Sequence, residues 1–175
     1  MRFFDFGKHH LDGESWKLGD RILAEIPNLA AEWKVIHQFQ TRNYPIGNFP
    51  GPLPWGLWVG IVARDNNNGY YSKSYVLAFP NDGLQLWNEK NMLGEFNHLP
   101  PAGEWTRIEM THEKVEDNYF ISVSFEEVEV LRHKVELDPE YGCFPAGTLF
   151  DATIGFGNHE DQLPASIGNL IVLEK

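Results

Sequence analysis

Apolar and polar residues alternate along much of the chain with a period of two, the spacing of a β-strand that buries one face. In residues 33–39, Trp-Lys-Val-Ile-His-Gln-Phe, the apolar side chains of Trp33, Val35 and Phe39 fall on one strand face. A helix would repeat its apolar residues every three to four positions, and no long segment shows that repeat. The chain is therefore predicted to be all-β.

Short alternating runs of this kind are separated by clusters of Gly, Pro, Asn and Asp, which favour turns or tolerate positive φ. About eleven strands are expected on this pattern. They cover residues 2–6, 21–26, 33–39, 56–64, 73–79, 84–88, 105–112, 119–125, 128–137, 150–156 and 167–173. Because each strand must bury its apolar face against a second sheet, we expect a sandwich or a barrel.

The size and composition of the chain fit one domain with a substantial core. Its 175 residues match a single domain, and 42% of them are hydrophobic. The only cysteine, Cys143, excludes an internal disulfide, so the fold must rest on packing. Cys143 has no His near it in sequence and is expected to be a small buried residue rather than a nucleophile.

The charge balance bears on the partners of the protein. Fourteen Lys and Arg against 25 Asp and Glu give a formal net charge of −11. Such a surface repels the phosphates of nucleic acids and anionic lipid headgroups, so we expect neither as a partner. Asp5 and Lys8 interrupt the first apolar residues before a signal-peptide core can form. Localisation stays open between the cytoplasm and secretion without a visible signal peptide.

Three stretches of the sequence carry a family resemblance. They are residues 32–39, residues 103–110 with the hairpin 119–130, and residues 154–158 leading into 164–172. Together they resemble the concanavalin A-like lectin and glucanase superfamily, which includes galectins, laminin G-like modules and legume lectins. The resemblance covers residues 19–175 and implies one domain over residues 1–175, a two-sheet antiparallel jelly-roll sandwich. It concerns the fold far more than the ligand.

The resemblance implies carbohydrate binding as the leading function. Galectins use a His-x-Asn-Pro-Arg strand, a further Asn, and a Trp followed by Glu; this sequence has those residue types at other spacings, so galactoside specificity is not implied. An indole covers the apolar face of a sugar while amides and carboxylates bond its hydroxyls. We predict a site on the concave sheet and its rim, with Trp87 as the stacking residue unless it is a core tryptophan. The predicted site residues are Trp87, Asn88, Glu89, Arg64, Asn67 and His37, with Trp58 as a second aromatic.

Glycoside hydrolysis is the enzymatic alternative. Glucanases of the superfamily carry Glu-x-Asp-x-x-Glu on one strand, so that two carboxylates flank the glycosidic bond. The nearest match, residues 127–132, has Glu129 in place of Asp and Arg132 in place of the final Glu. We therefore expect a protein that is not an enzyme, with Glu127 and Glu129 as solvated carboxylates.

No cofactor and no metal ion are predicted, since the histidines lack zinc spacing and residues 65–76 depart from an EF-hand. A jelly-roll calcium site at Asp65 and Asn67, or at residues 158–161, stays open. Aromatic residues also crowd the region after the proline-rich segment 41–55, at Trp55, Trp58, Tyr70, Tyr71 and Tyr75. Such a patch could bind an apolar small molecule, such as a pigment or lipid, or mediate homo-oligomer formation.

Overall fold

Twelve β-strands make up the regular structure of the described residues. The computed structural model describes residues 2–11, 21–30, 32–41, 57–64, 71–79, 83–88, 91–98, 100–101, 103–135, 150–158 and 165–175. The strands are β1 (Arg2–Leu11), β2 (Arg21–Leu29), β3 (Trp33–Thr41), β4 (Leu57–Arg64), β5 (Tyr71–Phe79), β6 (Leu84–Asn88), β7 (Asn91–Phe96), β8 (Thr106–Val115), β9 (Asn118–Phe125), β10 (Val128–Val135), β11 (Phe150–Asn158) and β12 (Ala165–Glu174).

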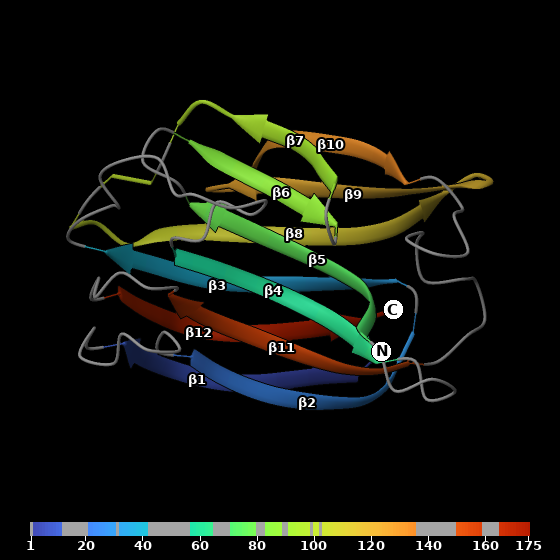
Figure 1. Ribbon diagram of the computed structural model, residues 1–175, viewed down its shortest axis with the longest axis horizontal. Helices are drawn as coiled ribbons and strands as arrows, with labels where there is room; N and C mark the ends of the chain where they lie inside the picture. Colours follow the sequence, from blue (N-terminus) through green and yellow to red (C-terminus); the bar gives the residue numbers. More distant parts are fainter. Residues whose placement is uncertain are drawn as a thin grey trace.

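The strands form two six-stranded sheets packed face to face (Figure 1). One sheet, called here the β8 sheet, has the order β1-β12-β3-β8-β9-β10, and the other, the β6 sheet, has the order β2-β11-β4-β5-β6-β7. All pairings are antiparallel. The prediction of a two-sheet antiparallel sandwich is confirmed, and each sheet has one face against its partner and one outer face.

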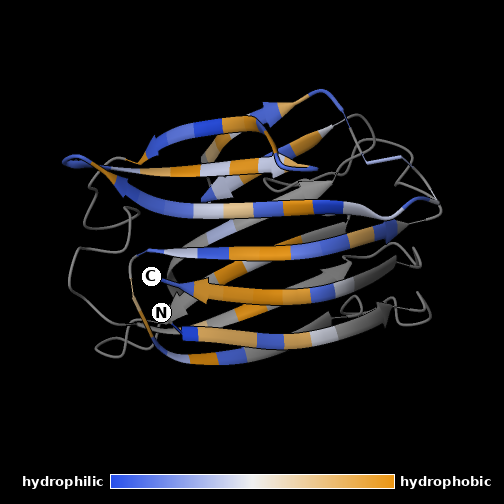
Figure 2. Cartoon of the chain, turned by 180° about the vertical axis from the view of Figure 1, so that it is seen from behind, coloured by the Kyte–Doolittle hydropathy of each residue, from blue (hydrophilic) through white to orange (hydrophobic). Residues whose placement is uncertain are grey.

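The core lies between the two sheets and follows the predicted alternation. On β3, Trp33, Val35 and Phe39 are at most 1% exposed, and from the β6 sheet Val59 and Ile61 are fully buried against that face. Figure 2 shows the result as alternating hydrophobic and hydrophilic bands along the strands. Burial of each such side chain stabilises the fold by about 1.5–3 kcal/mol. These contributions stabilise a chain whose single cysteine cannot form an internal disulfide.

Four ring side chains form a cluster inside this core. The His112 ring stacks between Trp33, at 5.5 Å between centroids, and Tyr119, at 5.2 Å. Tyr75 of β5 packs against the same group, 6.0 Å from Trp33 and 5.4 Å from His112. Because these residues come from β3, β8, β9 and β5, the cluster joins the two sheets.

Strand β7 was missing from the sequence-based prediction. Its sequence, Asn-Met-Leu-Gly-Glu-Phe, does not alternate, because it is an edge strand that packs Leu93 and Phe96 partly against the core and leaves Met92 45% exposed. The ends of other strands also differ: β1 continues to Leu11, where a strand ending at residue 6 was expected. Pairing with β12 extends β1 beyond its apolar part.

The two sheets meet closely at the edge formed by β7 and β10. Gly94 of β7 faces Leu131 of β10, and a Cβ at Gly94 would lie 2.9 Å from the Leu131 Cδ1 atom. A side chain at Gly94 would therefore displace the Leu131 side chain from its packed position.

A charged network fixes the start of β1 beside the end of β12. The Arg2 guanidinium forms an ion pair with the Glu174 carboxylate, which also accepts a hydrogen bond from the Ala30 N–H at 2.8 Å. The bond from Arg2 outweighs burial and lowers the pKa of Glu174. Arg2 also donates to the Pro27 carbonyl at 3.1 Å, so the network ties β1 and β12 to the end of β2.

Candidate functional site

Trp87 lies on the outer face of the β6 sheet. Along β6 the buried residues Leu84, Leu86 and Asn88 alternate with the partly exposed Gln85 and Trp87. The Trp87 Nε1–H donates a hydrogen bond to the Gln85 Oε1 atom at 3.1 Å. Trp87 is therefore not a core tryptophan: its indole is held at the surface by a neighbouring amide.

The structure does not place Asn88 beside Trp87. Asn88 is only 4% exposed and faces the interior, because successive residues of a strand point to opposite sides of the sheet. A ligand on the Trp87 face would not reach the Asn88 amide. Glu89 and Asn67, the next polar residues of the predicted site, lie outside the described residues.

Trp58 and Arg64 both belong to β4, and the structure describes their backbone but not their side chains. Trp58 is in register with Ala78 of β5, and Ala78 with Gln85 of β6, so Trp58 stands two strands from the Trp87 region. Arg64 ends the strand, six residues away, which is about 20 Å along an extended strand. The β6 sheet thus carries Trp58, Arg64 and Trp87, with Arg64 well separated from Trp58.

His37 lies inside the sandwich. It is 0% exposed, on the face of β3 that also carries Val35 and Phe39, and neither ring nitrogen bonds to a described residue. Burial lowers the pKa of His37 from 6.5 to about 3, so the ring is neutral at physiological pH. In this position His37 supports the core and does not contact a ligand on either outer face.

The predicted aromatic patch after the proline-rich segment is divided. Tyr75 is fully buried in the ring cluster with Trp33 and His112, because the alternation of β5 turns it inward. Trp55 and Tyr70 lie outside the described residues. Tyr75 therefore belongs to the core and not to a surface for an apolar ligand.

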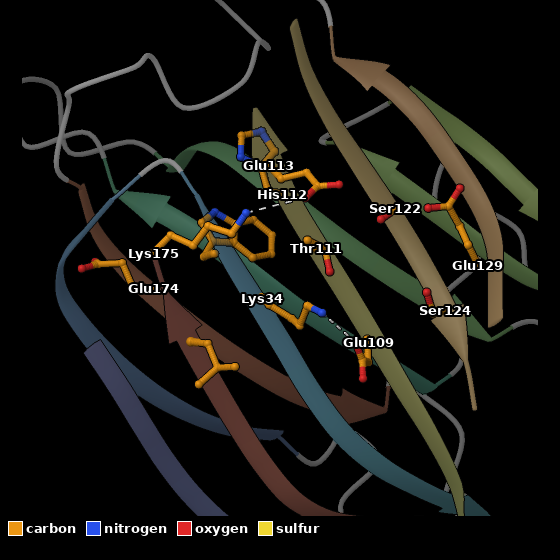
Figure 3. A pocket seen from close by; sticks show the side chains of 12 residues that line it. Lys34, Glu109, Thr111, His112, Glu113, Ser122, Ser124, Glu129, Glu174 and Lys175 are labelled. Atoms are coloured by element: carbon orange, nitrogen blue, oxygen red, sulfur yellow. Dashed lines mark ion pairs between the residues drawn. The ribbon is translucent and has the colours of Figure 1, made fainter. Parts of the chain in front are cut away.

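A polar hollow of about 400 Å³ opens on the β8 sheet and is lined by residues of β3, β8, β9, β10 and the end of β12 (Figure 3). The hydroxyl-bearing residues Thr111, Ser122 and Ser124 lie between the charged side chains of Lys34 and Glu129. None of the residues predicted as site residues from the sequence lines it. The short polar residues that alternate along β8 and β9 are the sequence signal that could have identified it.

Glu109 is held in the hollow by two cations. Its carboxylate accepts hydrogen bonds from Arg107 at 2.9 Å and 2.5 Å and pairs with the Lys34 ammonium at 3.0 Å. Burial by itself would raise the pKa of Glu109, but the hydrogen bonds from Lys34 and Arg107 prevail and lower it. Glu109 is therefore ionised and engaged with two cations.

The remaining carboxylates of this face are also paired. Arg132 lies 3.2 Å from Glu129 and 3.7 Å from Glu113, and Glu127 is 75% exposed at 3.6 Å from Arg107. A glycosidase needs one carboxyl group whose pKa is raised so that it can protonate the leaving group. Glu109 has the opposite shift, so it is a poor candidate for that acid.

No group of three or more His, Cys, Asp or Glu side chains able to hold a metal ion occurs within the described ranges. Both calcium sites left open by the sequence fall on residues, or side chains, outside them. In the same part of the chain, no helix is long and apolar enough to cross a membrane.

Two six-stranded antiparallel sheets in this strand order form the concanavalin A-like jelly roll found in lectins and glucanases. The suspected fold is therefore confirmed. Solved structures with the fold include the potassium-bound carbohydrate recognition domain of Emp46p, with a TM-score of 0.59 at 9% identity over 98% of this chain and 87% of that one.

Two further solved structures with this fold, a lectin and an enzyme, differ from each other in function. Winged bean acidic lectin complexed with methyl-α-D-galactose has a TM-score of 0.58 at 11% identity, over 98% of this chain and 97% of the lectin. An endo-1,3-β-glucanase from Streptomyces sioyaensis has a TM-score of 0.57 at 10% identity, over 89% of this chain and 70% of the glucanase. No protein-family model and no curated protein matches the sequence. At these identities the similarity concerns the fold alone.

Proposed function

We propose that this protein is a carbohydrate-binding module that holds a glycan without cleaving it. The observation that carries the proposal is Trp87, whose indole lies partly exposed on the outer face of β6 and is fixed by its hydrogen bond to Gln85. A fixed, accessible indole can stack on the apolar face of a sugar ring at little entropic cost. The Gln85 amide beside it offers a further polar group to sugar hydroxyls.

The structural neighbours support the same function. Among them are a carbohydrate recognition domain and a lectin complexed with methyl-α-D-galactose. The fold also serves a glucanase, so it cannot by itself distinguish binding from hydrolysis. The paired carboxylates favour binding, because Glu109 is stabilised as an anion by Lys34 and Arg107.

The proposed site extends from Trp87 over the β6 sheet. Trp58 and Arg64 share that sheet, and Asn67 and Glu89 follow β4 and β6 directly in the sequence. We assign direct sugar contact to Trp87 and Gln85, with Trp58, Arg64, Asn67 and Glu89 as the remaining contacts. The inward-facing His37 and Asn88 act by supporting β3 and β6.

A glycan array followed by calorimetry on the best glycan tests the proposal. Trp87→Ala should weaken binding about thirtyfold, corresponding to about 2 kcal/mol for an aromatic hot spot. Val128→Ala, which shortens another exposed apolar side chain, is the matched control and should leave the affinity unchanged. The melting temperature of Trp87→Ala should stay within a few degrees, since the indole is not in the core.

Three results would refute the proposal. One is unchanged affinity in Trp87→Ala, which would place the site elsewhere. The second is cleavage of the bound glycan, detected by chromatography of the reaction mixture. The third is an absence of array binding together with an apolar molecule retained in native mass spectrometry of protein from its natural source. That measurement also reports whether the chain forms a homo-oligomer.

A further inference from the structure

A second exposed tryptophan lies on the opposite side of the sandwich. Trp105 directly precedes β8 and is 46% exposed. The next residue, Thr106, is buried, and Arg107 is partly exposed, so the alternation of β8 directs Trp105 to the outer face of the β8 sheet. Trp105 and Trp87 therefore lie on different sheets and face away from each other.

The turn that presents Trp105 is fastened to β3. The Gln40 Nε2–H donates a hydrogen bond to the Gly103 carbonyl at 2.8 Å. Gly103 has a φ of +82°, and the Glu104 N–H bonds the Pro101 carbonyl at 3.2 Å, which closes the turn. The left-handed conformation favours glycine at this position. Gln40 thus positions the segment from which the indole projects.

The indole extends across β3 to a position without a side chain. Gly168 of β12 is in register with Gln38 of β3. A Cβ at Gly168 would lie 3.3 Å from the Trp105 Cζ3 atom and 3.5 Å from the Gln38 Oε1 atom. Any larger residue at Gly168 would displace the indole, so glycine leaves room for Trp105 to approach the sheet.

Two amides lie beside Gly168, the position over which the indole extends. The Asn169 Nδ2–H donates to the Gln38 Oε1 atom at 3.0 Å. This bond leaves the Gln38 amide nitrogen and the Asn169 amide oxygen without a partner among the described residues. The surface thus combines a flat apolar ring with one available donor and one available acceptor, the combination that recognises a sugar ring.

We propose that Trp105, Gln38 and Asn169 form a second glycan-binding surface, specific for an extended neutral glycan. The proposal rests on the carbohydrate-binding function proposed above and adds a second surface on the other sheet. Trp105 stacks on one sugar, and the Gln38 and Asn169 amides bond its hydroxyls. Gln40 and Gly168 are positioning residues.

The separation between the Trp105 surface and the polar hollow determines how long the ligand must be to contact both. Lys34, at the edge of the hollow, is four residues from Gln38 on the same face of β3, a separation of about 13 Å. A glycan stacked on Trp105 and directed along β3 reaches the hydroxyl groups of Thr111, Ser122 and Ser124. The net charge of −11 disfavours an anionic chain at this surface.

Nuclear magnetic resonance of the indole N–H groups tests this directly, because the chain has six tryptophans and so six such signals. Cellohexaose, laminarihexaose and mannohexaose are the probes, each compared with its disaccharide. At least one hexasaccharide should shift the Trp105 signal, assigned from Trp105→Phe, and the disaccharide should bind more weakly. Hexagalacturonate, an anionic chain of equal length, should leave the signal in place.

Variants separate a specific site from a general surface effect. Trp105→Ala should lower the affinity for the effective hexasaccharide about tenfold. Gly168→Ala should lower it severalfold while keeping the indole. Phe3→Ala removes an aromatic side chain that is 59% exposed on β1 of the same sheet, and it should change the affinity less than twofold. Equal losses in Trp105→Ala and Phe3→Ala would overturn the proposal.

The two surfaces can fail separately. If the hexasaccharides shift the Trp87 signal but not that of Trp105, the second surface is wrong and the proposed function stands. If only the Trp105 signal shifts, the second surface stands and the site at Trp87 is wrong. If no probe shifts either signal, the second surface is refuted, and the glycan array decides about the site at Trp87.

Discussion

The buried histidine His37 makes the stability of the fold depend on pH. In the folded protein burial lowers the pKa of His37 to about 3, whereas the unfolded chain has the ordinary value of 6.5. The unfolded state therefore takes up a proton at a higher pH than the folded state does. The contribution of His37 is complete above pH 6.5 and is lost as the pH falls towards 3.

The size of the effect follows from the two pKa values. Between pH 7 and pH 5 the unfolded state gains about 2 kcal/mol from protonation of this side chain, while the folded state gains almost nothing. His37→Leu keeps an apolar side chain in the core and removes the titration. The fall in the free energy of unfolding between pH 7 and pH 5 should be about 2 kcal/mol smaller in this variant than in the wild type.

Urea denaturation of both proteins at pH 7 and pH 5 measures this difference. If wild type and His37→Leu lose the same free energy, His37 is not held neutral by the core and the reasoning is wrong. A direct check is the ring proton signal of His37 in the folded wild type, which should not titrate between pH 8 and pH 5.

Two further predictions concern the edge of the sandwich and an exposed carboxylate. Gly94→Val should destabilise the protein by about 1–3 kcal/mol because its Cβ would meet Leu131, whereas Glu95→Val, at the exposed neighbouring position, should change the melting temperature little. Glu127→Gln should leave glycan binding measured by calorimetry unchanged, because this carboxylate is 75% exposed and does not line the hollow; a tenfold loss would show that it contacts the ligand.

The strands and the sandwich could be predicted because burial on one face imposes a period of two on the sequence. The same period places His37 with Trp33, Val35 and Phe39, so its inward position was already contained in the alternation. It likewise places Asn88 opposite to Trp87. The predicted site grouped residues by chemical type and by nearness in sequence, and in a strand nearest neighbours face opposite ways.

Other features depend on contacts that a single sequence does not reveal. Strand β7 pairs only with β6, so its own sequence carries little of the alternation of an inner strand. In the sequence, Trp105 resembles an ordinary apolar residue at the start of a strand. Its exposure becomes evident only in the structure, where the indole lies over Gly168 of β12. The hollow joins residues of β12, β3, β8, β9 and β10, which only the sheet order brings together.

The antiparallel pairing of β1 with β12 determines how this side of the molecule responds to mechanical load. Arg2 is in register with Glu174, and Leu11 with Ala165. Tension between Arg2 and Glu174 acts along the inter-strand hydrogen bonds and breaks them one after another, starting at this end of the pair. Tension between Arg2 and Ala165 runs parallel to the strands and loads every bond of the pair at once. A weak force applied across the two strands therefore separates them, whereas a strong force is needed to make them slide along each other.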